Sequence, residues 1–297
     1  MNNSRRVSLD IIYQGKIISK YINDDLIDFS INDSANQSSD DITISLNDKE
    51  HKWLKNWVTE AGDKIEVKAT SYNWNSIGEK YSINFGSYYV DEPEYTINPS
   101  TFSLKALSIK ANGSFRDIPK SKIWKNATLK SVASTIALNN GFTLYYDSNT
   151  NPKLSEEEQS LQTDMEYLQN LCSSNGLNLK IYNNKLVIFS ESVYESKPSK
   201  MIITPDMFLG QANFKRNLTD CGYDKAVLKC KTSKQTISAS YTRPQSLNKK
   251  TGLKILPLND SVDTQADALR VCQAKLREKN KSEYTASFSL PGLVKLY

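Results

Sequence analysis

The first 110 residues are a succession of short segments in which apolar and polar side chains alternate, with no long crossover helix between them. The clearest segments are 7–31, 41–46, 62–69, 81–90 and 101–109. Alternation with a period of two is typical of half-buried strands, because successive side chains point to opposite faces of the sheet. Parallel neighbours need a long crossover, so the pattern predicts about six antiparallel strands in a barrel or sandwich.

The period changes after Arg116, where apolar residues recur at helical spacing. Residues 128–137 predict one helix, and Thr163 and Glu166 have the spacing of a capping box at the start of a second. Between these two helices, Phe142 to Tyr146 predicts a short strand, and the polar stretch after it predicts a loop. The pair Asn183–Asn184 predicts a tight hairpin turn between two further strands. This middle region is therefore predicted to be α+β.

Strand patterns return after residue 195, followed by a helix at 264–279 and a last strand from Tyr284 to Leu290. Tyr284, Ala286, Phe288 and Leu290 fall on one face of that strand. We expect this face to be buried against a neighbouring chain or barrel, so Tyr284, Phe288 and Leu290 are the candidate interface residues. The fold class is α+β, mainly β, with domain boundaries near 110 and 195 that depend on the change of period alone.

Charge and cysteine usage exclude several classes of protein. The 38 basic and 33 acidic residues are interspersed, which is typical of a solvated surface and not of a nucleic-acid-binding stripe. No apolar run approaches the length of a membrane span, and the N-terminus leads directly into a strand pattern, so we expect folding in the cytoplasm without membrane insertion. The four cysteines lack metal-ligand spacing, and only one histidine accompanies them. Cys172 and Cys272 are expected to be free thiols in helices, and a Cys221–Cys230 disulfide remains open.

No catalytic constellation is evident. A nucleophile–histidine pair would need His51, for which an exposed or helix-capping role is expected, and the glycines do not form a phosphate-binding loop. Three carboxylate clusters could supply the acid and nucleophile of a glycosidase: Asp40–Asp41, Asp91–Glu92 and Glu156–Glu158. They are predicted to lie in turns or loops, where carboxylates are ordinarily solvated surface charges. We predict that the protein is not an enzyme and has no catalytic, cofactor-binding or metal-binding residues.

Two functions stay open. A cell-wall hydrolase would lose its activity on changing Asp91 or Glu92. A carbohydrate-binding module would bind glycan through Trp53 or Trp57, although two tryptophans at this spacing are more typical of a packed helix face.

The segment from Ser160 to Phe189 resembles the phage late control protein D family, the baseplate hubs of contractile tails, which are related to the hub half of type VI secretion spikes. The residues that carry the resemblance are Gln162, Asp164, Tyr167–Leu168, Leu171, Gly176 and Leu186–Val187–Ile188. Residues 86–92 and 263–292 are similar to the same family. Its members usually continue beyond the Pro291–Gly292 position with strands that close a second barrel, so we expect either a shorter variant or closure by strands from elsewhere.

This resemblance implies two tube-like antiparallel β-barrel domains, at 1–110 and 196–297, with an intervening α+β domain at 111–195. It implies a homotrimer whose barrels form a pseudo-sixfold ring joining the sixfold tail tube to the threefold central spike. The implied partners are the spike, the tube or tube-initiator, the tape measure and the baseplate wedge proteins, with no nucleic acid. The implied location is the baseplate of a virion or tail-like particle such as a tailocin, assembled in the bacterial cytoplasm.

Overall fold

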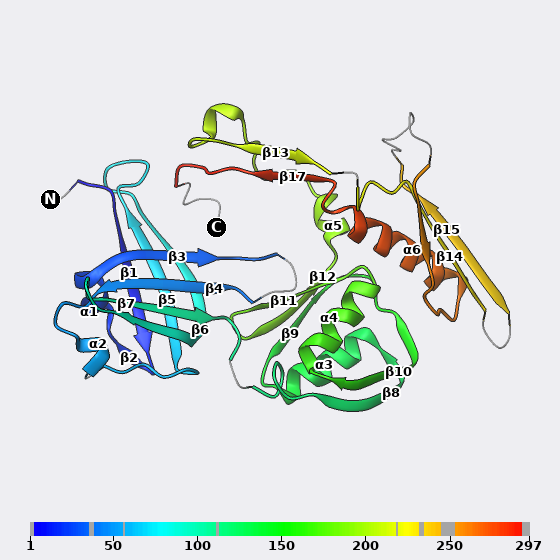
Figure 1. Ribbon diagram of the computed structural model, residues 1–297, viewed down its shortest axis with the longest axis horizontal. Coiled ribbons are helices and arrows are strands. Elements are labelled where there is room, and N and C mark those ends of the chain that lie inside the picture. The colour runs from blue at the N-terminus through cyan, green and yellow to red at the C-terminus, as the bar shows by residue number, and fades with distance from the viewer. Residues whose placement is uncertain are drawn as a thin grey trace. The chain divides into compact units, whose positions relative to one another are not determined.

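The computed structural model describes residues 3–35, 39–55, 57–110, 113–217, 219–231, 235–244 and 253–292. These residues divide into two compact units, and Figure 1 labels most of their elements. The first unit contains residues 3–169 and 179–189, and the second contains 170–178 and 190–292.

The first unit begins with a seven-stranded antiparallel sheet in the order β2-β1-β5-β6-β7-β4-β3. Its elements are β1 Arg6–Tyr13, β2 Lys16–Ile17, α1 Ser19–Asp25, β3 Leu26–Asn32, β4 Asp41–Asn47, α2 Lys52–Lys55, β5 Lys64–Tyr72, β6 Lys80–Thr96 and β7 Thr101–Leu107. The alternation that predicted these strands also builds the core, because Leu9, Ile44 and Val67 come from the inward face and are fully or almost fully buried. The predicted antiparallel pairing of this region is confirmed, but the expectation of strands and turns alone over 7–31 is wrong, because residues 19–25 form the helix α1.

The chain continues with an α+β region that belongs to the first unit except for residues 170–178. Its elements are β8 Lys120–Thr128, α3 Leu129–Asn139, β9 Thr143–Asp147, β10 Lys153–Gln162, α4 Asp164–Ser174, β11 Asn178–Tyr182 and β12 Lys185–Phe189. The order of its three-stranded sheet is β11-β12-β9, and β12 runs parallel to β9. The predicted capping box begins α4, because Thr163 Oγ1 accepts the Glu166 N–H at 3.2 Å while Glu166 accepts the Thr163 N–H at 3.0 Å.

One prediction for this region is wrong. The polar stretch before α4 is not a loop, because residues 153–162 form β10, which pairs with β8 along most of its length. Lys125 on β8 lies opposite Glu156 on β10, and their charged groups lie 3.7 Å apart. Opposite charges across a ladder stabilise it, so a sequence rich in Glu and Lys is compatible with a paired strand.

The second unit contains a three-stranded sheet covered by a long helix. Its elements are α5 Glu191–Glu195, a 3-10 turn at Pro205–Met207, β13 Asn213–Arg216, β14 Lys225–Lys231, β15 Thr236–Thr242, β16 Ile255–Leu258, α6 Gln265–Asn280 and β17 Tyr284–Ser287. The sheet order is β15-β14-β16, with β16 parallel to β14, which corrects the expectation of a purely antiparallel region. The expected face of α6 packs on this sheet through Ala268, Val271, Cys272 and Leu276.

The α+β, mainly β fold class is confirmed. The sheets are open and not closed barrels, because each strand order in the described residues ends in two edge strands. All four cysteines are free thiols, so the Cys221–Cys230 disulfide is not formed. No helix in the described ranges is long and apolar enough to cross a membrane.

Candidate assembly surfaces

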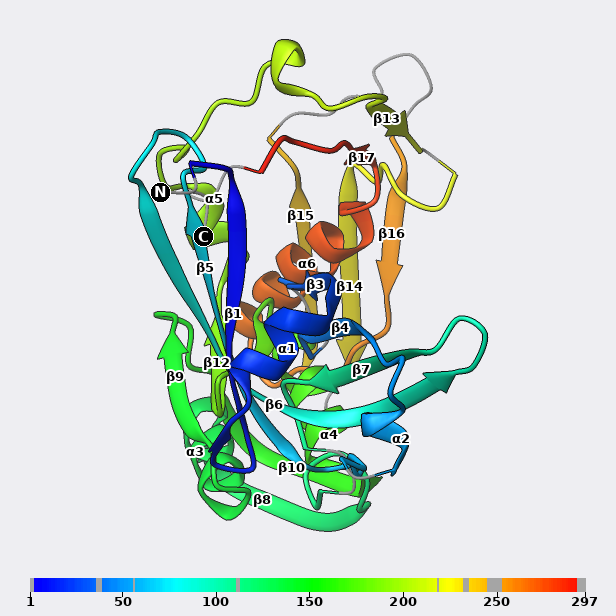
Figure 2. The same ribbon diagram turned by 90° about the vertical axis from the view of Figure 1, so that its left-hand side faces the viewer.

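The β1 edge of the seven-stranded sheet is blocked. β2 pairs with the last two residues of β1, and α1 lies beside the preceding ones (Figure 2). Asn23 Oδ1 accepts the Leu9 N–H at 2.8 Å, and Asn23 Nδ2 donates to the Leu9 carbonyl at 2.7 Å. Ser19 Oγ accepts the Ile11 N–H at 2.9 Å. Because these side chains satisfy the backbone groups that an incoming strand would need, this edge is closed to pairing with another chain.

The opposite edge, β3, is open. β3 pairs with β4 on one side, and none of the other described segments pairs with its outer side. Its sequence, LIDFSIN, carries neither lysine nor proline, which commonly protect an edge strand. Phe29 and Ile31 pack against the core, whereas Asp28, Ser30 and Asn32 are exposed. This edge therefore presents an amphipathic strand to which one more strand can be added.

β13 and β17 form a two-stranded ribbon with unlike faces, drawn in yellow-green and red in Figure 1. Opposed residues of an antiparallel pair share a face, so the register separates the side chains into two sets. One face carries Phe214, Arg216, Tyr284 and Ala286; the other carries Asn213, Lys215, Thr285 and Ser287. Both strands are exposed at every position. A two-stranded ribbon is marginally stable alone, so its apolar face is suited to be covered by another element.

An aromatic cluster lies at this apolar face. The ring of Phe208 lies 6.0 Å from that of Phe214 and 5.2 Å from that of Phe288, which follows β17 directly. Phe214 is 69% exposed and Leu209 is 64% exposed. Large apolar side chains gathered on one exposed face are typical of an interaction surface.

Of the predicted interface residues, Tyr284 is 56% exposed. The Arg216 guanidinium lies over its ring, with Arg216 Cζ 5.2 Å from the ring centroid. Phe288 is 38% exposed, and Leu290 is half-buried. The strand itself ends at Ser287. Burial of these residues by a neighbour stays a prediction. The sequence reasoning missed Phe214, and the only available signal was its place in a predicted strand, because no pattern reveals which distant strand will pair with it.

Buried ion pairs hold the base of the ribbon. Glu283, which directly precedes β17, accepts a hydrogen bond from Arg243 Nη1 at 2.7 Å and lies 3.6 Å from Arg216 Nη2. Arg243 Nη2 also lies 3.5 Å from Asp224, at the start of β14. Both carboxylates are almost completely buried. Buried charges need partners, so this network fixes the ribbon to the sheet of its own unit.

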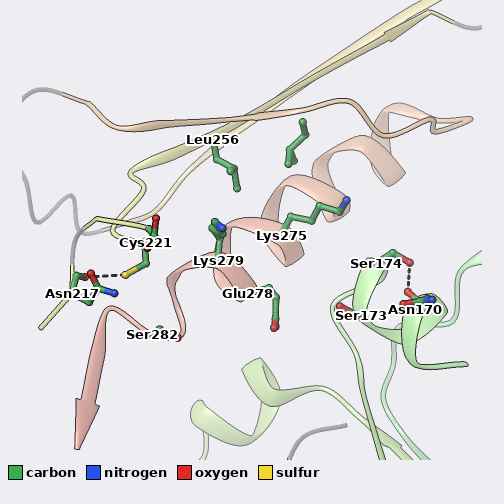
Figure 3. A pocket seen from close by; sticks show the side chains of 12 residues that line it. Asn170, Ser173, Ser174, Asn217, Cys221, Leu256, Lys275, Glu278, Lys279 and Ser282 are labelled. Carbon is green, nitrogen blue, oxygen red and sulfur yellow. Dashed lines mark hydrogen bonds between the residues drawn. The ribbon is translucent and has the colours of Figure 1, made fainter. Parts of the chain in front are cut away.

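The second unit also contains an open groove of about 880 Å³, shown in Figure 3. It is lined by the end of α4, the C-terminal half of α6, β16 and the residues before β14. Lys275 is paired with Asp260 at 2.5 Å, and the Cys221 thiol donates to the Asn217 carbonyl at 2.9 Å. Two polar side chains of the groove, Lys275 and Cys221, thus bond within the chain, and none of its lining residues is a histidine.

The carboxylate clusters weighed for hydrolysis are engaged in the fold. The prediction that these carboxylates lie in turns or loops is wrong for most of them. The structure places them on strands: Asp41 on β4, Asp91–Glu92 on β6 and Glu156–Glu158 on β10. Burial raises the pKa of Asp40, whose carboxylate lies 3.2 Å from Lys180 and accepts the Ser34 N–H. Lys105 lies 3.1 Å from Glu92. Within the described ranges, no three His, Cys, Asp or Glu side chains are grouped to hold a metal ion.

The tryptophans and the histidine have structural places. Trp53 is 3% exposed and its ring is stacked on Phe102 at 4.8 Å, so it is unavailable as a sugar platform. Trp57 packs edge-on against Trp53. The side chain that caps α2 is Asp48 and not His51, because Asp48 Oδ1 accepts the Lys52 N–H at 2.7 Å.

Comparison with known proteins identifies the fold. No family model and no curated sequence matches the chain. It is similar over 95% of its length to the 43 kDa tail protein of prophage MuSo2 from Shewanella oneidensis, with 16% identity, 81% of that chain covered and a TM-score of 0.65. A tail protein from Neisseria meningitidis MC58 has 13% identity, coverage of 96% and 80%, and a TM-score of 0.68. Prophage tail protein gp18 from Listeria monocytogenes EGD-e has 13% identity, coverage of 95% and 80%, and a TM-score of 0.59.

A more distant likeness is to a Francisella PdpA–VgrG complex, with 11% identity, 88% of this chain and 44% of that chain covered, and a TM-score of 0.52. At these identities the likeness establishes the fold. The chain therefore has the fold of phage tail proteins, as the resemblance to baseplate hubs predicted.

Proposed function

We propose that this chain is a non-enzymatic structural subunit of a phage tail or tail-like particle, and that three copies form a hub ring between a sixfold tail tube and a threefold central spike. The observation that carries the proposal is the match of at least 95% of the chain to each of three tail proteins. A match of this extent covers both units and not a single widespread domain.

The unequal edges of the large sheet support assembly by unlike surfaces. A sheet with one blocked and one open edge accepts a single added strand, so repeated contacts are of the head-to-tail kind. Head-to-tail contacts close into a ring when the rotation between neighbours is a simple fraction of a turn. In this proposal the β-rich parts, 1–110 and 196–297, form the ring, and 111–195 lies at its outside.

The proposed partners are the central spike, the tube or tube-initiator, the tape measure and the baseplate wedge proteins, in a particle assembled in the bacterial cytoplasm. The test is the mass of the purified full chain in solution, alone and after co-expression with a central spike protein of the same particle. We expect a three-copy species that recovers the spike. A chain that stays monomeric and recovers no tail component would contradict the proposal, and electron microscopy of particles carrying a labelled chain would locate it independently.

A further inference from the structure

The open edge of the large sheet and the unpaired ribbon of the second unit have complementary properties. We propose that β13 of one copy pairs with the outer edge of β3 of a second copy, so that the ribbon extends that copy's seven-stranded sheet. The inference deepens the proposed ring by naming its contact surfaces.

The choice of β3 follows from the hydrogen bonds at the two edges. Asn23 and Ser19 occupy the backbone groups of β1, so a strand added there would have to displace α1. None of the segments that the structure describes pairs with the outer side of β3, and its sequence has neither lysine nor proline. An exposed edge of this kind provides a row of backbone donors and acceptors for an incoming strand.

The faces of the two strands correspond. On β3, Phe29 and Ile31 point to the core, and on β13 Phe214 belongs to the apolar face. When the two strands lie side by side, Phe214, Tyr284 and the aromatic cluster continue the apolar layer of the sheet. The polar side chains then continue its solvent face, with Ser30 and Asn32 on one strand and Asn213 on the other. A shift of register by one residue would place each set on the wrong face, so this alternation selects the pairing.

Charge selects β13 over β17. β3 carries one exposed carboxylate, on Asp28. A second exposed carboxylate, on Asp24, lies in α1 just before the strand. β13 carries Lys215 on its polar face and Arg216 at its end, whereas β17, of sequence YTAS, has no charged residue. Opposite charges facing each other across strands stabilise the pairing, and like charges oppose it.

Charge exchange tests the pairing in the full chain, with self-association measured by sedimentation. We expect Asp28→Lys and Lys215→Glu each to weaken association by roughly tenfold, because each places like charges at every contact. The double variant Asp28→Lys/Lys215→Glu restores opposite charges and should associate within about twofold of the unchanged chain. Both positions are exposed, so folding should be unaffected, and circular dichroism checks this.

Mixing the two single variants gives a sharper result. Favourable contacts then form only between unlike copies, so copies must alternate and only even-numbered rings can close. We expect paired species but no closed three-copy ring in the mixture, whereas the double variant forms it.

The outcomes separate this inference from the proposed function. Single variants that form three-copy rings as well as the unchanged chain would overturn the β3–β13 pairing and leave the hub proposal standing. Single variants that are defective but not repaired in the double variant would also overturn the pairing. An unchanged chain that is monomeric at every concentration and recovers no tail component would overturn both.

Discussion

Arg243 Nη1 donates to the Glu283 carboxylate at 2.7 Å, across 40 residues of sequence, in a site where the Glu283 side chain is 4% exposed. The contact joins the end of β15 to the start of β17. It holds the ribbon in place through charge and not through an apolar core, because both ribbon strands are exposed.

Replacing Arg243 with Met should therefore destabilise the second unit by about 3–5 kcal/mol, because the buried carboxylates of Glu283 and Asp224 would both lose the positive charge of Arg243. Chemical denaturation, followed by far-ultraviolet circular dichroism, measures the loss in the free energy of unfolding. Arg216→Gln is the matched control, since this side chain is 41% exposed and 3.6 Å from Glu283, and should cost less than about 1 kcal/mol. Equal losses for both variants would show that Arg243 has no special place in the network.

Asn23→Leu should open the blocked edge of the large sheet. The Leu9 N–H and carbonyl would lose their partners, which costs roughly 1–3 kcal/mol. The variant should also form larger, heterogeneous species, because its sheet would then have two edges able to pair. Sedimentation and urea denaturation report the two effects separately, with Lys20→Ala, at an exposed position of the same helix, as control. A destabilised variant that keeps the size distribution of the unchanged chain would contradict the blocking role.

Phe214→Ser should weaken assembly without weakening the fold. Phe214 is 69% exposed within its own chain, so the free energy of unfolding should change by no more than about 0.5 kcal/mol. If the phenyl ring of Phe214 is buried in a neighbouring copy, the same change should weaken association by roughly tenfold or more. Ile202→Ser, at a side chain 78% exposed and outside the ribbon, is the control and should leave association unchanged. If both variants associate normally, the aromatic face is not an assembly surface.

Asp164 should make stability depend on pH. Burial alone would raise the pKa of this carboxyl, but hydrogen bonds from Lys120, Gln159 and Asn140 outweigh burial and hold the pKa below its usual 3.8. A lowered pKa means that the stabilisation is present above pH 3.8 and is lost as the pH falls through the folded-state value.

Asp164→Asn should accordingly cost about 1–3 kcal/mol at pH 7, and the difference from the unchanged chain should shrink as the pH falls below about 4. Urea midpoints at several pH values measure this. Glu156→Gln, at a side chain 63% exposed, is the control and should cost no more than about 0.5 kcal/mol at any of them. A difference that is constant across the pH range would rule out the ionised form as the source of the stability.

Gly86→Ala tests a close approach within the first unit. Gly86 has φ +87°, and a Cβ there would lie 2.6 Å from the side-chain Cγ of Asn183. Gly15→Ala is a matched control, since Gly15 has φ +77° and open space around it. Both substitutions strain the backbone by about 1 kcal/mol, and only Gly86→Ala adds the collision. Denaturation midpoints that are equal for the two variants would mean that Asn183 moves aside without cost.

Local patterns in the sequence determined the strands of the first 110 residues, the capping box at Thr163 and the buried face of α6. These features follow from the period of apolar residues and from contacts within a few positions, which a single sequence displays directly. The pairing of β8 with β10 was not predictable in this way, because the charged partner of Glu156 is Lys125, on a strand about 30 positions away.

The sequence by itself determined that this chain builds amphipathic strands and mixed α+β layers, because side-chain periodicity is a local property. Only the tertiary structure decided which edges remain available. Asn23 blocks β1 across 14 positions, and Arg243 anchors the ribbon across 40. Such contacts depend on which distant segments the fold brings together, so no local pattern contains them.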